Sequence, residues 1–549
     1  MSKPSTNDLR SNPENLLLKK TILTVLLLVL LRSAHSQHNV VLLIADDLGT
    51  DYLGFYEDHV DTADVPNIRS LLAEGVRFQN AMSNPVCSAT RAGMLTGRYS
   101  FRTGVGGIVG GLGGSGQLDT SEITIPRLLE LYNPVLAKAS IGKWHLNNPT
   151  PAANLLFPNV VGYDHFEGPF IGALPDYSNW MKYTNGVAST ITNYATTENV
   201  DNAVSWLKTQ GNDPFFLWMA FNAPHSPYHL PPAGLYSDTT LSGTSTDINN
   251  NPKNYFIAAL EALDHEIGRL FDSLRVLNKL DSTDFIFVGD NGNATRTIQS
   301  ANPLRAKGTV YQYGVHVPLI ISGPSVVNPG RVSDALVNTV DLFATIPELF
   351  GDTNWQANIP VNKPIDSKSL MPILTDQDTS IRPWSFTEIF KTTTDSDDGK
   401  AMRNIEYKLI NFDDGRQEFY DLRLDPNEAN DLLLGTLTTV ERFNYNYLCS
   451  EMNALTGTGS FCNASVGIVN AVAGVNDVIA FPNPFTSQIF INTNFTNPAV
   501  ELRNCLGQII YSGNDLSSQN FSDLPKGLYY LRLIEVGNEV GDEVVKLLK

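Results

Sequence analysis

The sequence predicts a protein of the α/β class that ends in a small domain made only of β-strands. Two short apolar runs, Asn39–Ala45 and Asp284–Gly289, have the composition of strands that a parallel sheet buries on both faces. Helix-like segments such as Thr197–Lys208 and Tyr255–Leu277 lie between them, the second with apolar residues at roughly helical spacing. Strands that alternate with helices indicate one sheet with helices packed on both of its sides.

The composition of the chain changes after position 435. Ser, Thr, Asn and Gly dominate residues 453–465, so we expect a linker over residues 436–475. Residues 476–549 then contain short β-rich runs that are separated by Pro and Gly. This spacing predicts a small all-β sandwich as the last domain.

Length and charge limit the possible functions. The chain has 549 residues, with 38 Lys and Arg against 57 Asp and Glu, so its formal net charge is −19. A chain of this length is expected to hold about two to four domains. The acidic excess argues against general nucleic-acid binding, because a phosphate backbone requires a basic surface. A small anionic substrate stays possible, since a pocket can be locally positive.

Residues 1–36 have the features of a signal peptide. Lys19 and Lys20 precede an apolar run at residues 21–31, and small residues stand at the positions required for cleavage after Ser36. The run is shorter than the roughly 20 residues that span a bilayer. A retained membrane anchor is the alternative interpretation. We expect export, removal of this segment and a mature chain without a transmembrane helix.

Acidic and amide side chains directly follow the two predicted strands. Asp46 and Asp47 come after the first strand, and Asp290 and Asn291 come after the second. Ligands bind beyond the carboxyl ends of strands in open α/β sheets, so we expect these side chains at one rim. Three carboxylates and an amide oxygen suit Ca²⁺ or Mg²⁺ better than Zn²⁺. The alternative is that each acid caps the turn after its strand.

A cysteine at the start of a helix-like run belongs to the most specific motif of the chain. Cys87 stands where free backbone N–H groups and the helix dipole favour an anion, although a lone Cys there is more often a small buried residue. Residues 87–91 (CSATR), followed by residues 95–98 (LTGR), resemble the signature of type I sulfatases. In that family a separate maturing enzyme converts the cysteine to formylglycine. Ala89 stands where proline is commoner.

Further segments extend this resemblance over residues 38–435. Residues 142–145 (GKWH) are similar to the second signature of the family, and residues 223–227 (APHSP) to a segment with a substrate-side histidine. Residues 307–311 (KGTVY) resemble the segment with a second active-site lysine. The resemblance implies an alkaline-phosphatase-like mixed sheet flanked by helices. It also implies a catalytic domain over residues 37–375 and a smaller α+β subdomain over residues 376–435.

The resemblance implies a role for each residue of the site. Hydrated formylglycine at position 87 attacks sulfur, and its second hydroxyl later lets the intermediate collapse to aldehyde and free sulfate. One Ca²⁺ per chain is held by Asp46, Asp47, Asp290, Asn291 and the modified Cys87, and Asp290 is also the expected base. Arg91, Lys143 and Lys307 are implied to hold charge on the sulfuryl oxygens. His145 is implied to assist the diol, and His225 to contact the sulfate or to protonate the leaving oxygen. We expect His59, His165, His229 and His265 to be non-catalytic.

The C-terminal segment resembles the sorting domain of type IX secretion substrates. The resemblance rests on residues 481–485 (FPNPF), 500–503 (VELR), 524–529 (LPKGLY) and 544–549. An Ig-like carbohydrate-binding module is the alternative. The resemblance implies contact with the type IX machinery and a location in the medium or on the outer surface of a bacterium. Cys449 and Cys462 lie in the region of the predicted linker and are able to pair after export.

Together, these features predict an exported, calcium-dependent sulfuric ester hydrolase that acts on a sulfated carbohydrate or polysaccharide. The carbohydrate is inferred by analogy with the role of the family in polysaccharide breakdown. One alternative is a phosphate or phosphonate monoester hydrolase of the same superfamily. The other is a non-catalytic carbohydrate-binding surface protein, and the intact set of site residues argues against it.

Overall fold

The computed structural model of the chain forms two units. It describes residues 38–56, 59, 61–111, 113–300, 302–393, 395–457, 479–481, 485, 487–492, 499–504, 508–525, 527–534 and 543–549. The larger unit contains the described residues up to Gly435 and those from Asn444 to position 457. The smaller unit contains Thr436–Phe443 and the described residues from position 479 onwards. The predicted signal peptide over residues 1–36 lies outside the described residues.

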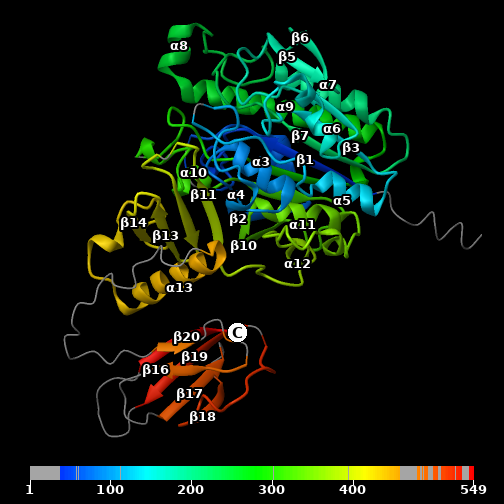
Figure 1. Cartoon of the computed structure of the whole chain (residues 1–549). Helices are drawn as coiled ribbons and strands as arrows, with labels where there is room; N and C mark the ends of the chain where they lie inside the picture. Colours follow the sequence, from blue (N-terminus) through cyan, green and yellow to red (C-terminus); the bar gives the residue numbers. More distant parts are fainter. Residues whose placement is uncertain are drawn as a thin grey trace, which may run out of the picture. The chain divides into compact units, whose positions relative to one another are not determined.

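The larger unit is built on one mixed sheet of ten strands, in the order β10-β2-β9-β8-β1-β7-β3-β4-β5-β6 (Figure 1). At its centre β1 (Asn39–Ala45) runs parallel to β8 (Thr283–Gly289) on one side and to β7 (Phe215–Ala220) on the other. β3 (Ala137–Gly142) runs parallel to β7. The outer strands are β2 (Gly75–Met82), β4 (His165–Gly168), β5 (Trp180–Thr184), β6 (Val187–Ile191), β9 (Leu319–Ser322) and β10 (Arg331–Asn338).

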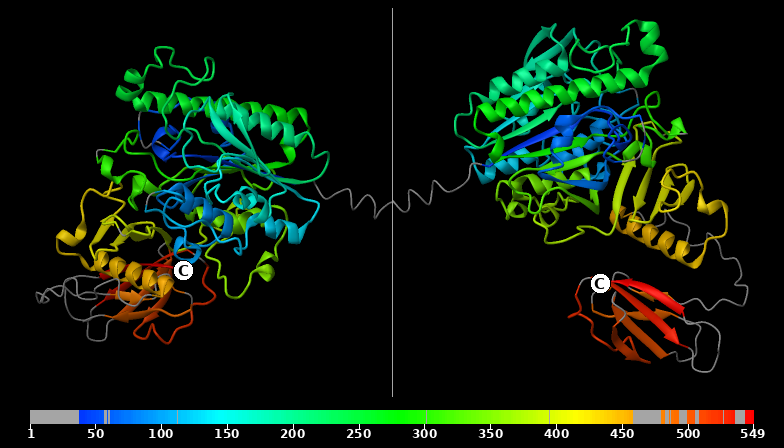
Figure 2. Two further views of the ribbon diagram at one scale, coloured as in Figure 1. Left: turned by 45° about the horizontal axis from the view of Figure 1, so that its top comes forward. Right: turned by 180° about the vertical axis from the view of Figure 1, so that it is seen from behind.

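Helices cover both faces of this sheet because its central strands are apolar on both sides. Every residue of β1 is buried, and its even-numbered and odd-numbered side chains enter two different cores. α3 (Cys87–Thr96), α5 (Ile125–Tyr132) and α11 (Leu342–Leu349) close the first core. α2 (Pro66–Ser70), α7 (Ala195–Leu207) and α9 (Pro252–Val276) close the second, and Figures 1 and 2 show these two layers.

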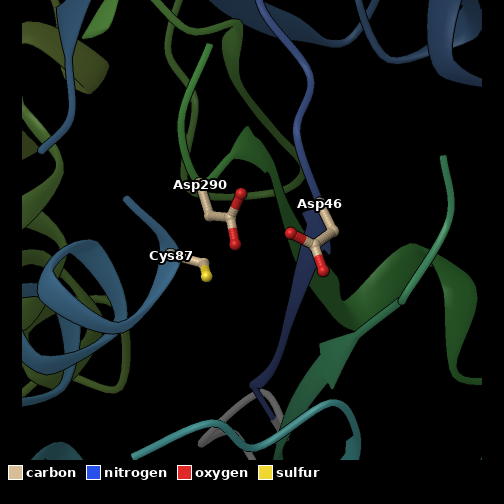
Figure 3. Close-up of side chains that lie close together, drawn as sticks. All are labelled: Asp46, Cys87 and Asp290. Atoms are coloured by element: carbon tan, nitrogen blue, oxygen red, sulfur yellow. The ribbon is translucent and has the colours of Figure 1, made fainter. Parts of the chain in front are cut away.

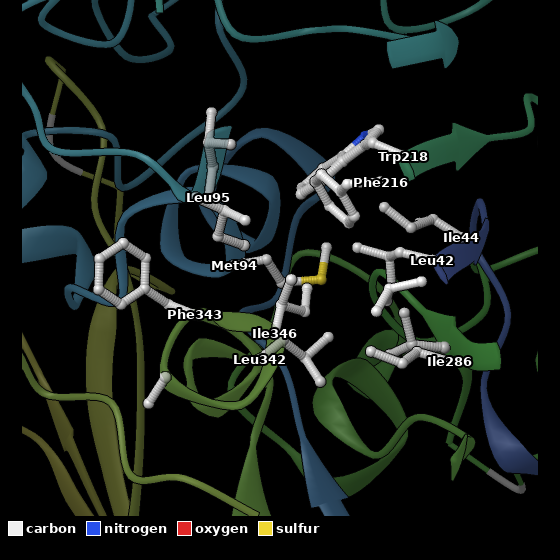
Figure 4. Packing of buried hydrophobic residues seen from close by; sticks show 14 of the residues in the cluster. Leu42, Ile44, Met94, Leu95, Phe216, Trp218, Ile286, Leu342, Phe343 and Ile346 are labelled. Carbon is white, nitrogen blue, oxygen red and sulfur yellow. The ribbon is translucent and has the colours of Figure 1, made fainter. Parts of the chain in front are cut away.

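The first core joins the strands to the helix that begins at Cys87. Figure 4 shows Leu42 and Ile44 of β1 facing a cluster that includes Met94 of α3 and Ile346 of α11. All four side chains are completely buried. Burial of one such side chain contributes about 1.5–3 kcal/mol to stability. The core therefore fixes α3 against the sheet, and with it the position of its first residue.

The remaining short elements connect the main layers. The α-helices are α4 (Ser100–Thr103), α6 (Phe157–Val160), α8 (Ser245–Asn250), α10 (Gln312–Val315) and α12 (Met371–Leu374). The 3₁₀ turns are η1 (Thr50–Tyr52), η2 (Ala152–Leu156), η3 (Leu280–Ser282), η4 (Pro303–Arg305), η5 (Thr339–Asp341), η6 (Trp355–Asn358) and η7 (Leu432–Leu434).

A second sheet and a helix follow the ten-stranded sheet. The antiparallel strands are β11 (Ser385–Ile389), β12 (Gly399–Arg403), β13 (Tyr407–Phe412) and β14 (Gln417–Asp421). α13 (Thr439–Thr456) buries Tyr445, Leu448 and Met452, and the hydroxyl of Tyr445 donates to the Gln417 side chain of β14 over 2.7 Å. The predicted linker over residues 436–475 is therefore corrected for residues 439–456. A helix forms there because three residues at helical spacing are buried in the larger unit. The polar residues between them in the sequence hide this pattern.

From position 479 onwards, the described strands of the smaller unit are all antiparallel. β15 (Ile479–Phe481) pairs with β16 (Phe490–Asn492). A four-stranded sheet has the order β18-β17-β19-β20 and contains β17 (Ala499–Asn504), β18 (Ile509–Gly513), β19 (Leu528–Ile534) and β20 (Glu543–Leu548). The prediction of an all-β C-terminal domain is confirmed.

Two further predictions concern the cysteines and the membrane. Cys449 is disulfide-bonded, and its predicted partner Cys462 lies outside the described residues. Within the described part of the chain, no helix has both the length and the apolar character needed to cross a bilayer.

Candidate active site

The candidate site lies at the carboxyl ends of the neighbouring strands β8, β1, β7 and β3. Asp290 follows β8 and Asp46 follows β1, and the last residues of these two strands are paired in parallel register. Lys143 follows β3, and its backbone N–H donates to the carbonyl of Ala220 in β7 over 2.7 Å. Figure 3 shows Asp46, Asp290 and Cys87 close together, with their side chains directed towards a common space. The two strand ends thus meet at one rim.

Two oxygens of this cluster are buried without a hydrogen-bond donor in the described part of the chain. They are Oδ1 of Asp46 and Oδ1 of Asn291. Together with Asp47 and Asp290 they belong to a set of three carboxylates and one amide, each only 0–3% exposed. Ligand atoms of Asp46, Asp290 and Cys87 lie within 4.8 Å of one another. An unsatisfied buried acceptor costs about 1–3 kcal/mol, so this oxygen-rich set fits a hard divalent cation such as Ca²⁺.

Asp46 and Asp47 are neighbours in opposite electrostatic environments. Burial raises the pKa of Asp46 to about 7, and the negative charge of Asp290 adds to this effect. Burial also disfavours the ionised form of Asp47, but the charges of His225 and Lys307 outweigh it and hold the pKa of Asp47 below its usual range. Lys307 forms an ion pair with Asp47. Near neutral pH the site therefore combines one fixed carboxylate with one whose proton a metal ion would displace.

Cys87 is the first residue of α3 and faces a histidine. Val86 before it is extended, and the helix begins at Cys87 itself. The Cys87 side chain is buried, and Sγ lies 3.1 Å from Nδ1 of His145. Burial raises the pKa of the Cys87 thiol, while burial and the charge of Lys143 lower the pKa of His145 well below its usual range. His145 is therefore neutral at pH 7 and is held at a backbone φ of 60°, an uncommon conformation that points to a functional constraint.

Arg91 lies one helical turn after Cys87 and is completely buried. Its Nε and Nη2 donate to Oδ2 of Asp290 over 3.0 and 2.8 Å, and its Nη1 donates to the carbonyl of Lys143 over 2.7 Å. Burial disfavours the charged guanidinium, but Asp290 and Asp46 outweigh it, so the pKa of Arg91 is raised. Lys143 forms a buried ion pair with Asp46. Both cations thus hold carboxylates of the cluster in place.

His225 and Lys307 approach the cluster from the side of Asp47. Nε2 of His225 lies 3.6 Å from Oδ2 of Asp47. Nδ1 of His225 lies 2.6 Å from the carbonyl oxygen of Ser226, which only accepts, so this nitrogen carries a proton. Burial lowers the pKa of His225 to about 4, although Asp47 opposes this shift. The neutral ring therefore turns an unprotonated nitrogen towards the site.

Three residues that contact the site or its supporting backbone were not among the site residues predicted from the sequence. The Ser88 hydroxyl donates to the carbonyl of His145 over 2.9 Å and accepts from the backbone N–H of Val109 over 3.1 Å. Gly172 lies so close to the imidazole of His145 that a Cβ at this position would overlap the ring. Asn293 accepts from the backbone N–H of Gly49 over 2.6 Å. Ser88 adjoins Cys87 in the motif, but no sequence signal marks Gly172.

The histidines predicted to be non-catalytic make contacts of a structural kind. His229 stacks on Tyr177, with ring centroids 3.9 Å apart, and its Nε2 lies 3.0 Å from the hydroxyl of Tyr194. The other contacts are those of His165 with Glu167 and of His59 with Tyr313, and His265 is exposed on α9.

Family models match most of the chain. The model described as "Sulfatase" matches residues 38–352, which is more than half of the 549 residues. The model "N-sulphoglucosamine sulphohydrolase, C-terminal" matches residues 304–442. The model "Secretion system C-terminal sorting domain" matches residues 479–547.

Several curated proteins are similar over the same region. N-acetylgalactosamine-6-sulfatase of Homo sapiens is 30% identical over 374 residues, which are 61% of this chain and 65% of that protein. The uncharacterized sulfatase YdeN of Escherichia coli is 26% identical over 397 residues, covering 63% and 67% of the two chains. Arylsulfatase J of Mus musculus is 28% identical over 344 residues, covering 57% and 52%. The chain thus spans about half to two thirds of the length of these relatives.

Solved structures share the fold. Ps i-CgsB has a TM-score of 0.63 at 23% identity, covering 76% of this chain and 93% of that chain. BT4656, solved with its substrate D-glucosamine-2-N,6-O-disulfate, has a TM-score of 0.59 at 20% identity, covering 77% and 99%. The PsFucS1 sulfatase from Pseudoalteromonas sp. has a TM-score of 0.59 at 21% identity, covering 81% and 94%. These likenesses confirm the predicted alkaline-phosphatase-like fold class.

Proposed function

The chain belongs to the sulfatase family, and from this premise we propose that it is an exported hydrolase of sulfuric esters of carbohydrates. One observation carries the proposal: a cysteine that opens a buried helix faces a rim of carboxylates and an amide with orphaned oxygens. Lys143 and Lys307 border this rim and are paired with two of its carboxylates. A nucleophile, a cation site and fixed positive charge at one point are what cleavage of an anionic ester requires.

The proposed cofactors are one Ca²⁺ and a formylglycine made from Cys87. Asp46, Asp47, Asp290 and Asn291 would hold the ion, together with residue 87. When bound, the ion would offset negative charge on the sulfate and on the attacking oxygen. The all-oxygen set and its two orphaned acceptors support this assignment. A separate maturing enzyme would convert Cys87, whose hydrated aldehyde would provide the hydroxyl nucleophile.

The positively charged residues of the site would bind the sulfate group and orient the proposed base. We assign Lys143 and Lys307 to contacts with the sulfuryl oxygens, where one positioned donor is worth about 10²–10³ in rate. All three guanidinium nitrogens of Arg91 already donate hydrogen bonds, two to Asp290 and one to the carbonyl of Lys143. This geometry supports a positioning role for Arg91, in place of the direct sulfate contact expected from the family resemblance. Asp290, held in this way, is the proposed base that takes the proton of the nucleophile.

The two histidines would transfer protons at different residues of the cluster, His145 beside residue 87 and His225 beside Asp47. Neutral His145 presents Nδ1 at 3.1 Å from the side chain of residue 87, where it can hold a proton of the diol. His225 presents its unprotonated Nε2 beside Asp47. A sulfate ester bound nearby would raise the pKa of His225, because an adjacent negative charge favours the imidazolium. His225 could then protonate the leaving oxygen.

The C-terminal unit is proposed to direct secretion. Its match to a secretion-system sorting domain supports export by the type IX machinery to the medium or to the outer surface of a bacterium. A deletion of residues 476–549 tests this assignment. We expect the truncated chain to stay in the cell, whereas its appearance in the medium at wild-type level would contradict a sorting role.

The reaction is tested by parallel assays of sulfate and phosphate release. We expect release of sulfate from sulfated saccharides, supported by the sulfatases among the relatives. Matched phosphate monoesters should react at least about 10²-fold more slowly, an expectation that rests on the sulfatases among the relatives, because an enzyme discriminates by how well it binds each transition state. Preferred release of phosphate would establish the alternative of a phosphate monoester hydrolase. Sugar binding without release of either anion would establish a non-catalytic surface binder.

A further inference from the structure

Arg296 is a charged side chain that forms no ion pair with any carboxylate of the described part of the chain. It is exposed, and among the described residues its guanidinium donates one hydrogen bond, from Nη2 to the carbonyl of Asn249 over 2.7 Å. Its Cζ lies 5.9 Å from the centre of the Tyr228 ring, within the range of a cation–π contact. A guanidinium has five N–H donors, so most of those of Arg296 remain available to a ligand.

The backbone around Arg296 is tied to the candidate active site. Asn293, three residues earlier, accepts the backbone N–H of Lys307 at its carbonyl over 2.9 Å. The hydroxyl of Tyr228 donates a hydrogen bond to Oγ1 of Thr297, the next residue, over 3.5 Å. The segment that presents Arg296 is therefore held on one side by an active-site lysine and on the other by the aromatic partner of the guanidinium.

Tyr228 is tied to the same site. It follows His225 by three residues and is partly buried. Burial raises the pKa of Tyr228, and its hydroxyl donates to Thr297 in the segment whose Asn293 carbonyl accepts from the backbone N–H of Lys307. Together, Arg296 and Tyr228 combine a free cationic fork with an aromatic ring beside the residues that would bind the scissile sulfate.

We propose that Arg296 and Tyr228 form a subsite for a second oxyanion of the substrate, next to the sulfate ester that is cleaved. This inference rests on the proposed function and makes it more specific: the substrate is a saccharide with at least two acidic groups. The planar guanidinium binds two oxygens of a sulfate or carboxylate through two parallel hydrogen bonds. The chain has a formal net charge of −19, and an unpaired cation beside the site would make the local potential more favourable for a polyanion.

The test compares saccharides that differ by one acidic group. The first pair is D-glucosamine-6-O-sulfate and D-glucosamine-2-N,6-O-disulfate, with the corresponding galacto pair run in parallel. A third arm uses a monosulfated disaccharide with and without a uronic acid carboxylate, which separates the two sources of the oxyanion. The quantity measured is the ratio of kcat/KM for the more charged over the less charged member.

Wild type should prefer the more charged member of at least one pair by about 10- to 100-fold, which is the range for one charge-assisted hydrogen-bonded contact. Arg296→Gln should bring this ratio close to one. Arg296→Lys should retain part of it, because lysine keeps the charge but not the bidentate fork. The control is Arg275→Gln at the end of α9, where an exposed arginine pairs with Asp272. This control should leave the ratio unchanged.

A ratio near one in wild type for all pairs, or an unchanged ratio in Arg296→Gln, would overturn the subsite. Failure of the proposed function gives a different result, namely no sulfate release from any member. Titration calorimetry with the disulfated monosaccharides then decides the inference alone, using the full chain with Ca²⁺ present. Binding that weakens about tenfold or more in Arg296→Gln supports the subsite. Equal affinity, or no binding to wild type, contradicts it.

Discussion

Calcium should bind about tenfold more weakly at pH 6 than at pH 8, because a proton and the ion compete for Asp46. Burial and the charge of Asp290 raise the pKa of Asp46 to about 7 in the ion-free site. Above this pH the carboxylate is ionised and available as a ligand. Below it, each further pH unit raises the apparent Kd about tenfold. The direction is thus fixed: acid weakens calcium binding.

The size of the effect on stability follows from mass action. A ligand at about 100 times its Kd stabilises the folded state by about 2.7 kcal/mol. With an unfolding entropy of about 2.1 cal/mol/K per residue, a unit of about 400 residues then gains about 3 °C in Tm. At the same calcium concentration and pH 6, the ion stands at about ten times its Kd, and the gain falls to about 1.4 kcal/mol and about 2 °C.

The assay is thermal unfolding of chelator-treated protein during a Ca²⁺ titration at both pH values. Asp46→Asn should bind more weakly and lose the pH dependence, because no proton then competes at this position. Asp272→Asn replaces an exposed carboxylate of α9 and should behave like wild type. The reasoning is refuted if the calcium midpoint is the same at pH 6 and pH 8, or if Asp46→Asn keeps wild-type affinity.

Four further substitutions separate the chemistry of the site from the stability of the framework. Cys87→Ala and Asp290→Ala should each remove nearly all sulfate release and keep the near-UV circular dichroism of wild type; full turnover in a pure Cys87→Ala preparation would exclude the formylglycine assignment. Gly172→Ala should lower kcat about 10²-fold or more, because a Cβ there overlaps His145 and proton transfer is worth about 10²–10⁴; kinetics within twofold of wild type would contradict this. Leu128→Ala in the first core should cost about 2–5 kcal/mol in urea unfolding with kcat unchanged, and a loss below about 1 kcal/mol would show that the core collapses around the gap.

The elements next to the carboxylates were predictable because they carry the strongest local signals. The run Asn39–Ala45 coincides with β1, since a strand buried on both faces must be apolar throughout. The predicted helix Tyr255–Leu277 is α9, which begins earlier, at Pro252, because proline suits the first turn of a helix. In contrast, α13 was predicted as linker, since its three buried residues are separated by polar ones.

Some contacts of the candidate site could also be predicted from the sequence, and others could not. The carboxylates after β1 and β8 could be brought together from the rule for parallel strand ends alone. The approach of His145 to Cys87 could not, because it depends on long-range packing around Ser88 and Gly172. Asn293 and Arg296 were not predicted either, since their roles come from contacts with distant backbone groups and not from any local spacing.

The central claim is that Cys87 is the precursor of the nucleophile. The most direct test is the mass of the peptide that contains residue 87, taken from protein secreted by its native host. We expect the mass of an aldehyde at this position. A plain thiol in fully secreted protein would contradict the account and leave a dormant enzyme, a phosphatase-like relative or a binding protein.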